Sequence, residues 1–278
     1  MQARLRELRH PKERCYGTIM LVVGAIVWLL ILAALGVSLL KSPWHAVILL
    51  IEAAVILGIL SLAKMFYRAY LFGHAVLVSQ TQFPRLHESV AAASHRLGLA
   101  HPPQTFVYNS HGLTNALAMR VLRHRMVLLT SALIDVEHDR QVDFVVAHEV
   151  GHHVAGHLGF WRNLVKYPAH FVPFLGRAYS RARELTADRI GAHCVGDVEA
   201  ARGALAMLAC GSARLNAALD TQAFRAQEAL VPPITGFLLH IVSGYPRLTR
   251  RVQEVESFFA GSHGSSYITA GPSSPRLT

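Results

Sequence analysis

The sequence predicts an α+β protein that begins with a hairpin of two transmembrane helices and continues as a mostly helical domain with a small β-sheet. Residues 18–40 are apolar for 23 positions without a charge, and residues 44–63 form a second apolar run of similar length. Behind these runs, short strand-like segments alternate with longer stretches of helical periodicity. This alternation is typical of a sheet packed beside helices.

The first apolar run is long enough to cross a membrane, because a helix rises about 1.5 Å per residue and the hydrocarbon layer is about 30 Å thick. The second run contains one acid, Glu52, and Lys41-Ser42-Pro43 joins the two into a tight hairpin. A cleaved signal peptide is disfavoured, since the run is too long and a second one follows at once. A hairpin buried in a globular core is the other alternative.

Basic residues predict how the two spans are oriented. Five of them precede the first run, Lys41 alone lies between the runs, and Lys64 and Arg68 follow the second. Because segments rich in Lys and Arg stay on the cytoplasmic side, residues 1–17 and the chain after residue 63 are expected to be cytoplasmic. The protein would then be a multi-pass membrane protein with its soluble part in the cytoplasm.

Charge and cysteine content agree with this placement. The formal net charge is +10, but the basic cluster near the N-terminus adjoins the first span, where anionic lipids attract such segments. No RNA- or DNA-binding motif accompanies it, so the lipid bilayer is the expected partner and nucleic acid is not. The three cysteines have no paired spacing and fit reduced thiols on a cytosolic face.

The most informative segment reads His148-Glu149-Val150-Gly151-His152. On a helix, two histidines four apart project from one face. Their imidazoles can hold one Zn²⁺, and the intervening carboxylate can act as general base. Asp139 is the candidate N-cap of this helix, and Gly151 would let a neighbouring segment approach closely. A helix with exposed histidines is the alternative.

A second histidine pair competes with this motif. His153 and His157 are also four apart, but no glutamate follows the first of them. The pair therefore lacks a built-in base, and we expect these histidines on the surface or behind the metal ligands.

A catalytic zinc also needs a third protein ligand and an open position. Glu184 is the candidate, and Asp188, four residues later, shares its helical face. A ligating histidine usually donates its other N–H to a carboxylate, which is the role predicted for Asp188. The alternative is an acid pair held by neighbouring arginines on a solvated face.

With H-E-V-G-H followed by E-L-T-A-D, the chain resembles the M48 family of membrane zinc peptidases, which includes the HtpX-like bacterial heat-shock proteases and the CAAX prenyl protease group. Segments 114–118 and 127–133 also resemble family segments, so the likeness extends from about residue 80 to residue 255. It implies a zincin-type (gluzincin) metalloprotease domain at 64–260, one Zn²⁺ per chain, and a bacterial inner or plasma membrane.

The resemblance also implies roles for single residues. His148, His152 and Glu184 would be the zinc ligands, with Glu149 as catalytic acid/base. A polypeptide substrate, drawn from membrane or misfolded proteins, would lie along an edge strand and bind through main-chain hydrogen bonds. The residues expected to contact it are Asn115, Ala116, Leu117, Ala118 and Arg251.

One position departs from the family's pattern, because Tyr245 stands where a late family element carries a histidine. A phenol can donate a hydrogen bond to an oxyanion, so Tyr245 is a candidate catalytic residue. Shaping the turn before the next helix is the alternative. The departure motivates a second hypothesis, a zinc-binding membrane scaffold without catalysis. A third is a membrane protein whose histidines are incidental.

Other segments follow local patterns. Helices are expected at 83–97, 179–194, 198–209 and 215–230, and strands at 105–108, near 117 and at 126–130. Residues 160–176 are rich in aromatic residues yet charged, and we expect an interfacial or re-entrant flap there. Residues 234–242 are expected to pack against the membrane, and 261–278 to be disordered. The sequence indicates neither the oligomeric state nor the cleavage specificity.

Overall fold

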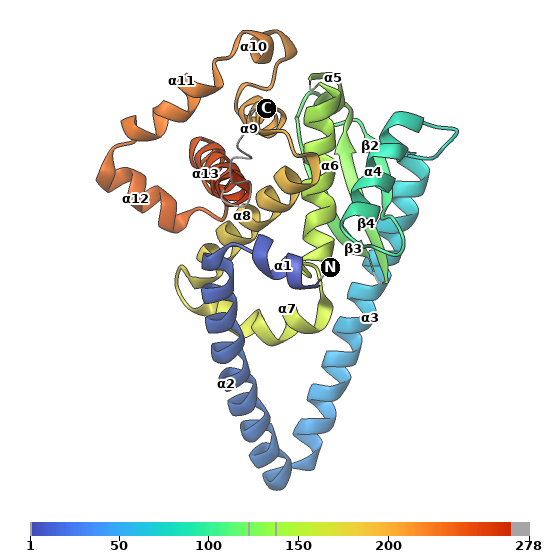
Figure 1. The fold of residues 1–278 in the computed structure, drawn as a ribbon. Helices are drawn as coiled ribbons and strands as arrows, with labels where there is room; N and C mark the ends of the chain where they lie inside the picture. The colour runs from blue at the N-terminus through green and yellow to red at the C-terminus, as the bar shows by residue number, and fades with distance from the viewer. Residues whose placement is uncertain (1, 122, 137, 268–278) are drawn as a thin grey trace, which may run out of the picture.

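The computed structural model describes residues 2–121, 123–136 and 138–267 (Figure 1). Its elements are α1 Gln2–Leu8, α2 Pro11–Lys41, α3 Pro43–His74, β1 Val76–Leu77, α4 Pro84–Arg96, β2 Gln104–Tyr108, β3 Ala116–Val121, β4 His124–Thr130, α5 Ser131–Val136, α6 Asp139–Val154, α7 Phe160–Lys166, the 3₁₀ turn η1 Tyr167–Phe171, α8 Leu175–Val195, α9 Val198–Cys210, α10 Ala213–Ala218, α11 Thr221–Ala226, η2 Gln227–Leu230, α12 Pro233–Val242 and α13 Leu248–Tyr267. A small sheet and many helices confirm the predicted α+β class.

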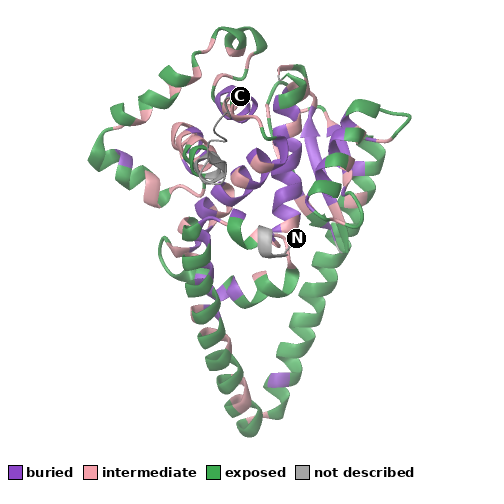
Figure 2. Cartoon of the chain, viewed as in Figure 1, coloured by how far each residue is buried: buried purple, intermediate pink, exposed green. Residues whose placement is uncertain are grey.

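Helices α2 and α3 are both long and apolar enough to cross a membrane, which suggests membrane anchoring. Pro11 and Pro43 stand at their first turns, where the missing N–H costs nothing. The prediction of a tight hairpin is wrong, because the two helices diverge from Ser42 as a V (Figure 1). The reason is tertiary: α2 packs on α7, η1 and α8, whereas α3 packs on β1 and β3. Both helices are exposed along most of their length (Figure 2).

The sheet has the strand order β1-β2-β4-β3, so β3 lies at an edge. β2 and β4 run parallel, and β3 is antiparallel to β4 with Leu117 opposite Leu128. Val107 and Leu129 belong to the main core, while Phe106 and Leu128 join a smaller cluster at the end of α3. Since strand side chains alternate between faces, the sheet is covered on both sides.

Helix α6 is the central helix of the part of the chain that follows α3, and it is buried over most of its surface (Figure 2). His138 is its N-cap, and the backbone N–H of His138 donates to the Gln141 side chain. The predicted N-cap, Asp139, is instead the first residue of the helix. Gly151 lies against α8, because a Cβ there would come 3.0 Å from the Ile190 side chain. This close approach lets α8 cross α6 near the histidines.

The C-terminal part departs from prediction in two places. A single helix over 215–230 is wrong, since the chain forms α10, α11 and η2 there. Asp220 is the reason: its side chain accepts hydrogen bonds from the backbone N–H groups of Gln222 and Ala223 and so starts a new helix. The last helix, α13, continues to Tyr267, into the stretch predicted to be disordered. Residues 268–278 lie outside the described residues.

Candidate metal centre

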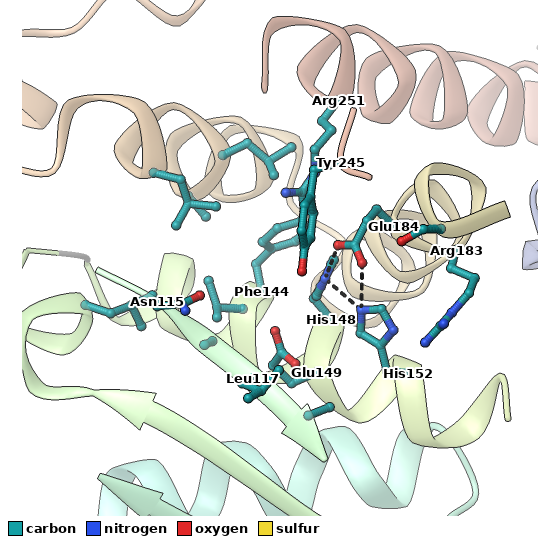
Figure 3. A pocket seen from close by; sticks show the side chains of 18 of the residues that line it. Asn115, Leu117, Phe144, His148, Glu149, His152, Arg183, Glu184, Tyr245 and Arg251 are labelled. Atoms are coloured by element: carbon teal, nitrogen blue, oxygen red, sulfur yellow. Dashed lines mark hydrogen bonds and ion pairs between the residues drawn. The ribbon is translucent and has the colours of Figure 1, made fainter. Parts of the chain in front are cut away.

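The side chains of His148, His152 and Glu184 converge on one point (Figure 3). Helix α6 presents the two imidazoles one turn apart, and their Nε2 atoms are 3.2 Å from each other. Helix α8 brings the carboxylate: Glu184 Oε2 is 3.5 Å from His148 Nε2, and Oε1 is 3.7 Å from His152 Nε2. The three residues predicted as ligands are therefore brought together.

This spacing fits a tetrahedral zinc ion. With bonds of about 2.0–2.2 Å and tetrahedral angles, ligand atoms stand about 3.3 Å apart. The three separations found here are 3.2, 3.5 and 3.7 Å. Two imidazoles and one carboxylate also form a donor set of catalytic zinc sites, which keep the fourth position open. The described residues contain no second group of three such side chains arranged to hold a metal ion.

The charges around these ligands favour a cation. Although burial opposes it, hydrogen bonding and the charges of His148 and His152 hold the pKa of Glu184 well below its ordinary value. Burial lowers the pKa of His152, whereas Asp188 and Glu184 outweigh burial at His148 and raise its pKa to about 10. The carboxylates therefore stabilise positive charge between the imidazoles, which is the property a metal site needs.

Asp188 lies behind His148, with its Oδ1 2.9 Å from His148 Nδ1. This leaves Nε2 of the same ring to face the other donors. Arg251 of α13 donates two hydrogen bonds to Asp188, at 2.8 and 2.7 Å. The sequence predicts that Arg251 contacts the substrate. Arg251 does line the pocket, but its guanidinium is hydrogen-bonded to Asp188.

Glu149 lies on the pocket side of α6 and close to the edge strand β3 (Figure 3). Burial raises the pKa of Glu149 to about 7, and the charge of Glu184 adds to this, while His148 and a backbone hydrogen bond from Ala118 act in the opposite direction. The segment predicted to contact substrate, residues 115–118, lines the same cavity of about 470 Å³. The Glu149 carboxylate, the three candidate metal donors and the edge of β3 thus share one cavity.

Tyr245 reaches this pocket from the segment between α12 and α13 (Figure 3). Burial, with the charges of Glu184 and Glu149, raises the pKa of its phenol. The hydroxyl therefore stays protonated at neutral pH and can donate a hydrogen bond. Arg183, which precedes Glu184, also lines the pocket. It adds a second cationic or donor group that the motif alone does not single out.

The competing histidine pair does not form a second site. His153 contacts the backbone oxygen of Met126 at 3.0 Å, and burial lowers its pKa to about 4. His157 lies behind the candidate metal donors, with its Nδ1 2.9 Å from His152 Nδ1. Its Nε2 is 3.3 Å from Glu13 of α2. Glu13 is missed by sequence reasoning, because nothing local links an acid near the N-terminus to a distant histidine.

Comparison with known families agrees with this geometry. The family described as peptidase family M48 matches residues 80–166 and 160–259, which together make up well over half of the chain. The chain belongs to peptidase family M48. Both helices that supply the metal donors lie within the matched residues of this M48 peptidase, and membership implies a zinc metallopeptidase acting on a polypeptide. No curated protein and no solved structure matches the chain.

Proposed function

We propose that this M48 peptidase is a membrane-anchored zinc endopeptidase that cleaves membrane or misfolded proteins. The convergence of three metal donors, a buried carboxylate and a strand edge in one cavity supports this function. His148, His152 and Glu184 would hold the ion. When bound, zinc supplies Lewis acidity and lowers the pKa of a coordinated water to about 7.

Glu149 serves as the proton carrier. It takes a proton from the attacking water and passes it to the leaving amine. Burial raises its pKa to about 7, which suits a group that must accept and then release a proton near neutral pH. The hydroxyl of Tyr245 donates a hydrogen bond to the oxygen that gains charge during the attack.

The free edge of β3 binds the substrate. An extended peptide added as a further strand would form main-chain hydrogen bonds with residues 115–118, which line the pocket. The backbone of Ala118 also contacts Glu149, so a peptide paired there passes beside the base. Such binding needs an extended segment and little side-chain complementarity, which favours unfolded polypeptides as substrates.

Cleavage of an unfolded, casein-like substrate tests this function. Replacement of Glu149 by Gln should lower turnover by about 10²–10⁴-fold, because general acid–base catalysis contributes that much, and it should leave bound zinc unchanged. Glu88→Gln, on the exposed face of α4, is the control and should keep full activity. Equal turnover by the wild type and Glu149→Gln would reject the proposed function.

A zinc-binding scaffold without catalysis is the second candidate, and the tyrosine at position 245 favours it. It predicts stoichiometric zinc with no cleavage of any unfolded substrate. Metal content measured on the same preparations as turnover therefore separates the two candidates.

We also propose that α2 and α3 span the membrane, with residues 1–17 and 64–260 in the cytoplasm, and that α7 and η1 enter the bilayer from that side. Trp28 Nε1 donates to the Leu164 oxygen at 2.9 Å, and a Cβ at Gly24 would collide with the Val165 oxygen. A helix rises about 1.5 Å per residue, so Gly24 and Trp28 lie about 9 and about 15 Å along α2 from the start of the apolar run at residue 18. The outer side of α7 and η1 exposes apolar rings, namely Phe160, Trp161 and Phe171.

Labelling of single cysteines tests this placement, in a background in which the three native cysteines are replaced. Trp161→Cys should resist a membrane-impermeant maleimide in inside-out vesicles and react with a lipid-soluble one. Glu88→Cys, on the cytoplasmic part, should react with both. Equally fast aqueous labelling at the two positions would contradict a re-entrant segment.

A further inference from the structure

The N-terminal segment of the chain lies directly behind the candidate metal centre. Arg9 donates a hydrogen bond of 2.7 Å to the Ala155 oxygen, at the end of α6. The backbone N–H of His10 donates to the Thr186 hydroxyl of α8 at 3.0 Å. Glu13, in the first turn of α2, is paired with Arg9 and points at His157. These contacts tie the start of the first apolar helix to both helices that carry the metal donors.

Two buried side chains connect this segment to a metal donor. His152 Nδ1 and His157 Nδ1 are 2.9 Å apart. His157 Nε2 is 3.3 Å from Glu13 Oε1, and the two side chains are 0 % and 1 % exposed. Within the described part of the chain, His157 Nε2 makes no well-aligned hydrogen bond, and the Glu13 carboxylate is the polar group that lies close to it. Because an unpaired buried donor is costly, Glu13 is the partner that this nitrogen has.

The order of donors and acceptors then determines where each proton sits. An ionised carboxylate can only accept, so His157 carries its proton on Nε2, facing Glu13. His157 Nδ1 is then an acceptor, and the 2.9 Å contact takes its proton from His152 Nδ1. A neutral His152 protonated on Nδ1 keeps its lone pair on Nε2, the atom that faces His148 and Glu184. The Glu13 carboxylate therefore determines the tautomer of His157 and, through His157, the tautomer of His152.

We propose that Glu13 and His157 are positioning residues of the metal centre, which hold His152 in the tautomer and orientation that bind the ion. Asp188 does the same for His148 in a single step. The inference rests on the proposed function, since it takes zinc as the ion. It adds that the metal centre is completed by the first apolar helix, so docking of that helix and metal affinity are linked.

Zinc affinity of full-length protein in detergent, measured by competition with a chelator, tests the inference. His157→Leu fills nearly the volume of the imidazole but offers no polar atom. His157→Asn is smaller, yet its amide oxygen stands about where the imidazole Nδ1 stood and can accept from His152. Loss of a partner behind a ligand typically weakens metal binding about 10–100-fold. We expect that loss for His157→Leu and a clearly smaller one for His157→Asn.

A role in packing alone predicts the reverse order, because the smaller asparagine would leave a cavity. Asparagine binding zinc as weakly as leucine would therefore overturn the inference. If the leucine variant does not fold, His157→Gln replaces it. The amide nitrogen of this glutamine keeps a donor toward Glu13, but the side chain offers no acceptor toward His152. His157→Gln should therefore bind zinc more weakly than His157→Asn. Equal zinc affinities of these two variants would again overturn the inference.

Glu13 gives a second pair of variants. Glu13→Gln keeps an oxygen that accepts from His157 and should bind zinc nearly as well as the wild type, whereas Glu13→Leu should weaken binding about tenfold. Glu256→Leu is the control, because Glu256 is paired with Arg202 and Arg225 away from the metal donors. The visible spectrum of the Co²⁺-substituted protein should shift in His157→Leu and Glu13→Leu and stay unchanged in the control.

The zinc affinity of the wild type separates a failure of the proposed function from a failure of the positioning role. Wild-type protein that binds no zinc would overturn the proposed function, and this inference with it. Tight zinc binding by the wild type, together with unchanged affinity and an unchanged cobalt spectrum in His157→Leu and Glu13→Leu, would overturn the positioning role alone.

Discussion

Glu149 and Glu184 are two carboxylates of one pocket whose surroundings drive their proton affinities apart. Burial raises the pKa of Glu149 to about 7, while His148 and His152 hold the pKa of Glu184 far lower. Two carboxylates whose pKa values differ in this way can take different roles, one as a proton carrier and the other as a permanently charged metal ligand. These different surroundings explain why Glu149 suits proton transfer and Glu184 suits metal binding.

Asp188 should matter for stability as well as for metal binding. In Asp188→Asn the buried Arg251 loses its charged partner, which should lower the free energy of unfolding by about 3 kcal/mol and weaken zinc binding about 10–100-fold. Thermal unfolding and chelator competition measure the two effects. Asp143→Asn is the control, because the partner of Asp143, Arg85, is half exposed. It should lower the free energy of unfolding by about 1 kcal/mol or less and leave zinc affinity unchanged. Equal losses of stability and zinc affinity in the two variants would contradict the role of Asp188.

The phenol of Tyr245 should act on turnover more than on substrate binding. If its hydroxyl contacts the oxyanion, Tyr245→Phe should lower kcat about 100-fold with little change in KM. Tyr167→Phe, at an exposed position of η1, is the matched control. A raised KM with unchanged kcat would show instead that Tyr245 only contacts the substrate.

At the scale of elements, α2 and α7 approach closely at one glycine. A Cβ at Gly24 would come 2.0 Å from the Val165 oxygen, whereas a Cβ at Gly36 of the same helix would meet no atom within 4 Å. Small residues allow backbones to pack at such short range. The position of α7, which follows α6 along the chain, therefore depends on this glycine.

Replacement of Gly24 by Ala should push α7 away from α2 and destabilise the protein by about 1–3 kcal/mol. The same change at Gly36 should alter stability by no more than about 0.5 kcal/mol. Thermal unfolding of both variants in one detergent measures the difference. Equal melting temperatures would mean that α7 does not dock on α2 as described.

Elements with strong local patterns could be predicted from the sequence, and elements shaped by distant contacts could not. Helices α4, α8 and α9 lie close to their predicted positions because periodicity and stop signals such as Gly98 are local. The break at Asp220 is also local, but a side-chain cap inside a helical pattern is easily overlooked. The V of α2 and α3 depends on α7, η1 and α8, which follow far along the chain.

The same distinction applies to the candidate site. The H-E-x-x-H motif predicts His148, Glu149 and His152 from one helix. Glu184 is predicted as the carboxylate that such a site takes from a following helix, and Asp188 from its spacing to Glu184. The link from His152 through His157 to Glu13 joins the middle of the chain to its beginning. Only the folded arrangement brings these three side chains together.

At the scale of the whole molecule, the N-terminal segment joins the apolar helices to the last helix of the domain. Glu254 of α13 lies 3.3 Å from His10 and 3.6 Å from Lys12. The hydrogen bond from His10, more than any other contact, lowers the pKa of Glu254 to about 2. Docking of the segment is therefore linked to the ionisation of this carboxylate.

This link predicts a pH dependence of stability. The folded pKa of Glu254 is below its ordinary value of 4.5, so its contribution is present above pH 4.5 and is lost as pH falls toward 2. Wild type should exceed Glu254→Gln by about 1–2 kcal/mol at pH 7, allowing for partial exposure. Unfolding at pH 7, 4.5 and 3 should show the gap shrink below 4.5; a gap that does not change with pH would contradict the assignment.

Zinc content of the full-length protein, purified without chelators, is the direct test of a zinc site formed by His148, His152 and Glu184. We expect one zinc per wild-type chain and a loss of most of that zinc in Glu184→Ala, with the helical content unchanged. Wild-type protein without stoichiometric zinc, or a Glu184→Ala variant that retains it in full, would show that these three residues do not form a zinc site.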